Sequence, residues 1–189
     1  MPNFLDIILI GPPFAGKSSL GKLIAEKLAI PNVSYDKLRF NYFKEIGFDE
    51  ELAGELRAKG GFLSLVAYWS QFNAHAIKRV LEEHANCVFD LGGGPLVFEN
   101  QLHVAQIQQA LEPYQNVIRL LPSPDLQKSI EILRQRGSHL IGVNAQEFDW
   151  SSFFVKHAQN QKLAKIEVFT DGKSVEETCY EILELVCER

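Results

Sequence analysis

One segment near the start of the chain has the residue types and spacing of a phosphate-binding loop. It runs from Gly11 to Ser19, reads GPPFAGKSS and fits the pattern G-x-x-x-x-G-K-[ST]. In such a loop the glycines let the backbone wrap the phosphates, Lys17 reaches the β and γ oxygens, and the Ser18 hydroxyl coordinates Mg²⁺. We expect Ser19 to assist at the α-phosphate. The predicted nucleotide-binding residues of the loop are Gly11, Pro12, Pro13, Phe14, Ala15, Gly16, Lys17, Ser18 and Ser19.

The segments on either side of this loop favour the same interpretation. Leu5 to Ile10 is a continuous aliphatic run, typical of a strand buried on both faces of a parallel sheet. From Lys17 to Ala29 the apolar residues recur at helical spacing. Backbone N–H groups and the helix dipole would then converge on one anionic pocket. A glycine-rich turn with a solvated lysine is the structural alternative.

Two aspartates follow predicted strands. Asp36 comes after a short strand over Val33 to Tyr35, and Asp90 lies near the end of a strand over Cys87 to Leu91. Ligands of open α/β sheets bind beyond the strand ends, so Asp36 can orient an acceptor hydroxyl or take its proton, and Asp90 can hold the magnesium shell. Each has a structural alternative: Asp36 as a helix cap, and Asp90 as a purely structural residue.

Glycines follow the second of these aspartates. Gly92, Gly93 and Gly94 precede Pro95, and no helix or sheet interior would tolerate such a stretch. We expect a sharp loop at the end of the strand, which leaves room for a substrate and offers it N–H donors.

A candidate lid follows two arginines. The interval from Gly137 to Trp150 has no clear periodicity, so we expect it to be a mobile excursion over the site. Arg134 could stack on adenine, and Arg136 could neutralise charge on the transferring phosphoryl group. Alternatively, both are solvated residues in the last turn of a helix.

The remaining pattern alternates strands with helices, which indicates a doubly wound α/β domain. Further strands are expected over 117–121 and 166–169. Gly60 and Gly61 mark a break between two helices. The expected helices after the first cover 36–46, 50–58, 62–84, 101–111, 124–136 and 175–186.

Composition limits the classes of protein to consider. The chain has 189 residues, 46% of them hydrophobic and 23% charged, as in one globular domain. Its net charge of −5 gives no reason to expect a nucleic acid or a membrane surface as partner. No signal peptide or membrane span is recognisable, so we expect a cytoplasmic protein. The three cysteines show no metal-type spacing, and we expect all of them to be buried thiols.

Three motifs together resemble the shikimate kinase family: the loop GxxxAGKSS, an aspartate after the second strand, and a GGG stretch after the third. The similarity extends over nearly the whole chain. It implies a three-layer P-loop NTPase fold with a five-stranded parallel sheet in the order 2-3-1-4-5. We expect one domain over 1–189, with a substrate-binding helical region over about 36–84 and a lid over about 137–150.

The resemblance also suggests substrate-binding residues. The family's D-x-D pair corresponds to Ser34-Tyr35-Asp36, which keeps only the second aspartate, the one that contacts the reacting hydroxyl. The family's carboxylate-binding arginine corresponds to Arg57, and a later K-R pair corresponds to Lys156-His157. The family's R-P-L-L lid stretch has no counterpart. The predicted substrate-binding residues are Asp36, Arg57, Gly92, Gly93, Gly94 and His157.

The expected function is that of a small-molecule kinase dependent on ATP and Mg²⁺, with Lys17, Asp36 and Arg136 as catalytic residues and Ser18 and Asp90 at the metal. Its partners would be the nucleotide and a small hydroxyl acceptor, and the protein a monomer or weak dimer. A nucleoside or nucleotide kinase and a non-catalytic nucleotide-binding protein are the alternatives. A GTP-binding switch is disfavoured because no N-K-x-D sequence follows the D-x-x-G at Asp90.

Overall fold

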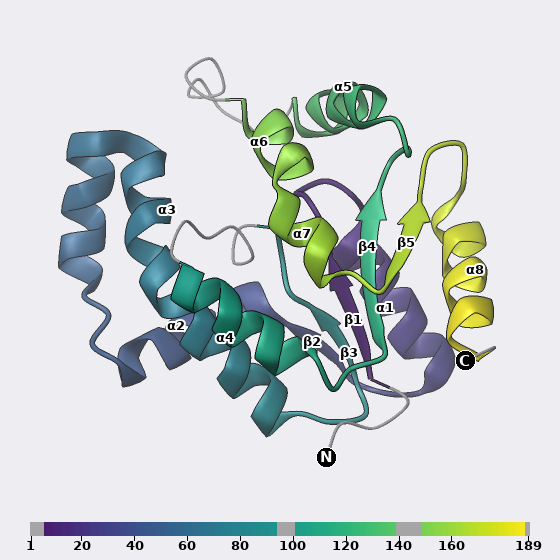
Figure 1. Ribbon diagram of the computed structural model, residues 1–189, viewed down its shortest axis with the longest axis horizontal. Helices are drawn as coiled ribbons and strands as arrows, with labels where there is room; N and C mark the ends of the chain where they lie inside the picture. Colours follow the sequence, from purple (N-terminus) through teal and green to yellow (C-terminus); the bar gives the residue numbers. More distant parts are fainter. Residues whose placement is uncertain (1–5, 94–100, 139–148, 188–189) are drawn as a thin grey trace.

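The computed structural model describes residues 6–93, 101–138 and 149–187 (Figure 1). These residues form a sheet of five parallel strands in the order β2-β3-β1-β4-β5, so the predicted order and the predicted α/β class are confirmed. The strands are β1 (Ile7–Ile10), β2 (Asn32–Ser34), β3 (Val88–Asp90), β4 (Asn116–Leu121) and β5 (Ile166–Phe169).

The central strand is buried on both faces, and its side chains alternate between two hydrophobic cores. Ile8 and Ile10 belong to one core, and Ile7 and Leu9 belong to the other. All four are fully buried, as the unbroken aliphatic run predicts for a strand covered on both sides. The sheet is therefore the middle of three layers.

Helices cover both faces of the sheet (Figure 1). The core that contains Ile7 is closed by α1, α5, α6 and α8, and the core that contains Ile8 is closed by α2, α3, α4 and α7. The helices are α1 (Lys17–Leu28), α2 (Tyr35–Glu45), α3 (Glu50–Glu83), α4 (Gln101–Leu111), α5 (Leu126–Gly137), α6 (Trp150–Lys156), α7 (Ala158–Leu163) and α8 (Val175–Cys187).

The α3 helix consists of two arms that meet at a kink. Gly61 has φ 69° and ψ −163°, which no helix accommodates, so the break predicted at Gly60 and Gly61 is confirmed. The two arms lie beside each other, and α2 packs against them (Figure 1). Together α2 and α3 form a helical region on one side of the sheet.

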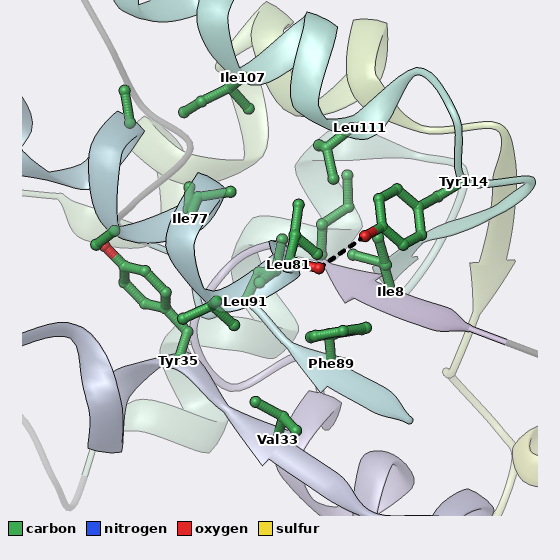
Figure 2. Close-up of a cluster of buried hydrophobic side chains, with 14 of the residues drawn as sticks. Ile8, Val33, Tyr35, Ile77, Leu81, Phe89, Leu91, Ile107, Leu111 and Tyr114 are labelled. Atoms are coloured by element: carbon green, nitrogen blue, oxygen red, sulfur yellow. Dashed lines mark hydrogen bonds between the residues drawn. The ribbon is translucent and has the colours of Figure 1, made fainter. Parts of the chain in front are cut away.

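Figure 2 shows how this helical region joins the sheet core. The side chains of Ile77 and Leu81 on α3 meet Phe89 of β3 and Ile8 of β1 in one cluster. Two buried hydroxyl groups find acceptors on α3: Tyr35 donates to Asn73 Oδ1 at 2.7 Å, and Tyr114 donates to the Leu81 carbonyl at 3.1 Å. Both bonds satisfy polar groups that burial would otherwise leave unpaired.

The two short helices α6 and α7 were not predicted from the sequence. They have seven and six residues, which is too short for a helical hydrophobic period to emerge. Long-range contacts position α6 instead: the buried Arg119 of β4 donates to the Val155 carbonyl at 3.1 Å. The candidate lid thus has structured ends, with Gly137 ending α5 and Trp150 beginning α6, while 139–148 lies outside the described residues.

One expectation about the cysteines is wrong. Cys87 and Cys179 are buried, but Cys187 is exposed because it is the last residue of α8, beyond the sheet-facing stretch.

Among the described residues, no helix combines the length and the hydrophobicity that crossing a bilayer requires.

We expect Phe43→Ala to lower the free energy of unfolding by about 3–5 kcal/mol, the usual loss for a large side chain removed from a core. Phe43 is fully buried, and its ring packs against Phe40, Phe48 and Phe72 at centroid distances of 5.5, 5.5 and 5.3 Å. Urea unfolding followed by circular dichroism measures the loss, and Phe43→Leu should lose less. Equal, small effects of both changes would contradict this packing.

Candidate functional site

The segment between β1 and α1 is held in shape by close backbone packing. Gly11 has φ 131°, and a Cβ atom there would lie 2.4 Å from the Leu120 carbonyl oxygen of β4. That separation is shorter than any real contact, so only glycine fits between the loop and the neighbouring strand. Ala15, deeper in the loop, is fully buried.

The N-terminus of α1 has no side-chain cap. Its N-cap residue is Gly16, which carries no group that could accept from the first N–H groups of the helix. By contrast, the N-cap residues of α3, α5 and α6 are Asp49, Asp125 and Asp149, whose carboxylates accept bonds from first-turn N–H groups. The first-turn N–H groups of α1, together with the positive end of the helix dipole, suit a bound anion.

Lys17 lies inside the loop that it follows. Its ammonium donates to the Pro12 carbonyl at 2.8 Å, and only 6% of the residue is exposed. Burial lowers the pKa of Lys17, while the negative charges of Asp90 and Asp36 oppose that shift. The charges of these three residues therefore interact. This is expected, because the residues follow three neighbouring strands, β1, β3 and β2.

A short hydrogen bond in the site joins Ser18 to Asp90. The Ser18 hydroxyl donates to Asp90 Oδ2 at 2.5 Å, and Asp90 Oδ1 accepts from the Gly92 N–H at 3.2 Å. Asp90 is 5% exposed, whereas Ser18 and Ser19 face solvent. A hydroxyl and a carboxylate at hydrogen-bond distance fit Mg²⁺, which takes one or two protein oxygens alongside phosphate and water. Within the part of the chain that the structure describes, no group of three or more His, Cys, Asp or Glu side chains could hold a metal ion.

The glycine loop after β3 packs directly on the phosphate loop. A Cβ atom on Gly93 would lie 2.6 Å from Pro13 Cδ and 2.8 Å from Pro13 N. Gly92 has φ 71°, which lets the chain turn here. The two predicted motifs are thus in contact, although Gly94 lies outside the described residues.

Asp36 is not a helix cap, so that alternative is wrong. The α2 helix begins at Tyr35 with Ser34 as its N-cap residue, which puts Asp36 in the first turn. Its carboxylate is 58% exposed and pairs with Arg39 at 3.1 Å. Ser34, where the family pattern has an aspartate, pairs in register with Asp90 on β3. Asp90 therefore lies beside Ser34, the position at which this chain lacks the aspartate of the family pattern.

Of the two arginines before the candidate lid, only Arg136 contacts the phosphate loop. Its guanidinium donates to the Phe14 carbonyl and to Thr170 Oγ1, both at 3.4 Å, and the Phe14 ring lies against Gly137. Arg134 instead forms an ion pair with Asp149, the N-cap residue of α6. Arg134 is exposed, and Arg136 is only partly so. Both arginines lie in the last turn of α5, and the contacts of Arg136 make it the less solvated of the two.

Two further predicted residues lie on other elements. Arg57 is exposed on the first arm of α3, where it lines a hollow of about 260 Å³ between α2 and α3. His157 is at the junction of α6 and α7, and its ring packs against Phe153 with a centroid distance of 5.7 Å. Neither prediction is tested by these contacts.

Sequence reasoning missed Arg39 and its contact with Trp69. Arg39 pairs with Asp36, and its guanidinium carbon lies 4.4 Å from the centroid of the Trp69 ring. The spacing of three residues between Asp36 and Arg39 on one helix was a readable signal. The contact with Trp69 was not, because it joins separate helices.

Gly93→Ala should lower the free energy of unfolding by roughly 1–3 kcal/mol, since the new methyl group overpacks against Pro13. Gly54→Ala is the matched control: no atom lies within 4 Å of a Cβ there, and the change should leave stability unchanged or raise it by up to about 1 kcal/mol. Urea unfolding of both variants measures the two free energies of unfolding. Equal stability of the two would show that the loops do not touch.

Solved structures of small-molecule kinases share this architecture. Shikimate kinase from Acinetobacter baumannii, in complex with shikimate, superposes with a TM-score of 0.66 at 18% identity, over 97% of this chain and 93% of that one. Shikimate kinase from Aquifex aeolicus gives a TM-score of 0.58 at 23% identity, over 97% and 96%. A gluconokinase from Sinorhizobium meliloti gives 0.54 at 16% identity, over 98% and 94%. No protein-family model and no curated protein sequence matches the chain. The chain therefore has the fold of the shikimate kinase-like P-loop kinases.

Proposed function

We propose that this protein is a small-molecule kinase that transfers the γ-phosphoryl group of ATP to a hydroxyl group of a small acceptor. The observation that carries the proposal is the Ser18–Asp90 hydrogen bond of 2.5 Å at the uncapped start of α1. The hydroxyl and carboxylate oxygens of this pair suit Mg²⁺, and the start of α1 beside them suits a phosphate. The Lys17 ammonium lies in the same loop.

In this proposal the phosphate loop binds the nucleotide. Backbone N–H groups of residues 11–19 hold the phosphates, and Lys17 leaves the Pro12 carbonyl to reach the β and γ oxygens. Ser18 and Asp90 would hold Mg²⁺, which neutralises phosphate charge when bound. Arg136 would stabilise charge on the transferring group, and its contact with the Phe14 carbonyl of the loop supports this role.

The acceptor would bind beside Asp36. Asp36 orients the acceptor hydroxyl or takes its proton, and its exposed carboxylate supports this role. The helical region of about 36–84 would form the acceptor pocket, with Arg57, the glycines at 92–94 and His157 as further binding residues. Residues 137–150 would form the lid, and Arg134 would contact the nucleotide. The solved kinases of similar fold act on shikimate and gluconate, both small hydroxylated acids, which supports an acceptor of that size.

We expect the purified protein to release ADP from Mg·ATP when a suitable acceptor is present. The panel contains shikimate, related hydroxy acids, sugars, nucleosides and nucleoside monophosphates. Lys17→Ala and Asp36→Asn should each lower kcat by roughly 100-fold or more, because each removes a group used in the transition state. Lys22→Ala, an exposed lysine on the same helix, is the control and should keep full activity.

The outcomes separate the alternatives. Stimulation only by nucleosides or nucleotides would favour a nucleoside or nucleotide kinase. Nucleotide binding without ADP release on any acceptor would contradict the kinase proposal and favour a non-catalytic nucleotide-binding protein.

We expect Asp90→Asn to weaken the dependence of nucleotide binding on Mg²⁺. Wild-type protein should bind ATP more tightly with Mg²⁺ than with EDTA, and the variant should lose most of that difference, since an amide is a poorer ligand than a carboxylate. Isothermal titration with and without Mg²⁺ measures the effect, with Asp125→Asn, at the N-cap of α5, as the control. An unchanged difference in the Asp90 variant would exclude Asp90 from the metal site.

A further inference from the structure

Phe14, in the middle of the phosphate loop, has a backbone conformation that bulky side chains rarely adopt. Its φ is 66°, in the left-handed region, where a Cβ atom crowds the backbone. Pro12 and Pro13 precede it with φ fixed by their rings, and the Ala15 N–H closes a turn by donating to the Pro12 carbonyl at 3.4 Å. A strained conformation persists only where surrounding contacts impose it, and such positions concentrate at functional sites.

The contacts of the Phe14 ring lie at the end of α5. A Cβ atom on Gly137, the last residue of that helix, would lie 2.6 Å from Phe14 Cε2 and 2.8 Å from Phe14 Cδ2. Gly137 is buried, and Phe14 is half-buried against the core that contains Leu133 of the same helix. Glycine is unfavourable inside a helix, so its use here fits a position where the ring occupies the space of a methyl group. The ring therefore joins the phosphate loop to α5.

Arg136, the residue before Gly137, is held by two long hydrogen bonds. Its Nη1 donates to the Phe14 carbonyl and to Thr170 Oγ1, both at 3.4 Å, whereas most N–H···O bonds are shorter than about 3.2 Å. Among the described residues, no carboxylate forms an ion pair with this guanidinium. A phosphate oxygen accepts shorter and stronger bonds from arginine, so it can replace both contacts. The arginine is thus available to a ligand of the loop.

We propose that Phe14 is a positioning residue: its ring holds the last turn of α5 against the phosphate loop, so that Arg136 binds the γ-phosphate and favours ATP over ADP. The long hydrogen bonds restrain the guanidinium only weakly, so the packing of the ring on Gly137 supplies the restraint. An arginine already held near the phosphates loses less conformational freedom on binding. The inference rests on the proposed function, in which Arg136 stabilises charge on the transferring group, and names the residue that holds this arginine.

The test compares the binding of ATP and ADP without an acceptor. Isothermal titration in the presence of Mg²⁺ gives both dissociation constants, and their ratio cancels effects on the phosphates that the two nucleotides share. We expect the wild-type protein to bind ATP more tightly. Arg136→Ala should lower this preference by roughly 10-fold or more, the loss of a hydrogen bond to a charged group. Phe14→Ala should lower it by roughly 3- to 10-fold, the cost of ordering one free side chain.

Further variants show whether the ring acts through the arginine. The double variant of Phe14→Ala and Arg136→Ala should lose no more preference than Arg136→Ala alone. Gly137→Ala should lower the preference while Phe14 is present, but not in the Phe14→Ala background, where the new methyl group has room. Phe14→Leu refills part of the volume and should recover part of the preference. Gln135→Ala, an exposed neighbour in the same turn, is the control and should change nothing.

Circular dichroism melts verify that each variant is folded. A purely structural role for Phe14 would lower the melting temperature and leave the preference for ATP unchanged. The assignment also fails if Arg136→Ala keeps the preference, or if the losses from Phe14→Ala and Arg136→Ala multiply in the double variant.

The proposed function fails separately. A preference for ATP that depends on Phe14 and Arg136, without ADP formation on any acceptor, would contradict the kinase and leave this positioning role intact. ADP formation on an acceptor, with an unchanged preference in the Phe14→Ala variant, would contradict the positioning role alone.

Discussion

The site depends on a backbone contact that leaves no room for side chains. At the carboxyl edge of the sheet, the loop after β1 packs against β4 at Leu120, and the loop after β3 packs against Pro13. The two missing Cβ atoms, at Gly11 and Gly93, allow three chain segments to meet. This packing fixes where α1 starts, and with it the positions from which Lys17 and Ser18 project.

The charges of the site form a compact set inside a protein with an excess of acidic residues. The negative charges of Asp90 and Asp36 both act on the Lys17 ammonium. Asp36 is paired in turn with Arg39. Burial opposes the positive charge of the lysine, while the two carboxylates favour it. An anionic ligand is therefore attracted by specific side chains and helix dipoles, since the surface as a whole would repel it.

The features that sequence predicted are those encoded by neighbouring residues. The phosphate loop, the strand ends near Asp36 and at Asp90, and the break at Gly61 all follow from local spacing, and the strand order followed from the family resemblance. The features that it missed require chain segments to meet. Arg136 reaches Thr170, Arg39 stacks on Trp69, and α6 is held by Arg119 from a strand. Cys187 was misjudged because its burial depends on where α8 leaves the sheet.

The kink in α3 has a geometric consequence for the hollow that lies between its arms and α2. At Gly61 nothing lies within 4 Å of where a Cβ atom would be, whereas a Cβ atom on the neighbouring Gly60 would lie 2.0 Å from Ser64 Oγ. The direction of the first arm relative to the second therefore depends on the torsion angles of Gly61, whose φ of 69° other residues rarely adopt. The width of the hollow thus depends on the backbone at Gly61, separately from the chemistry of the side chains that line it.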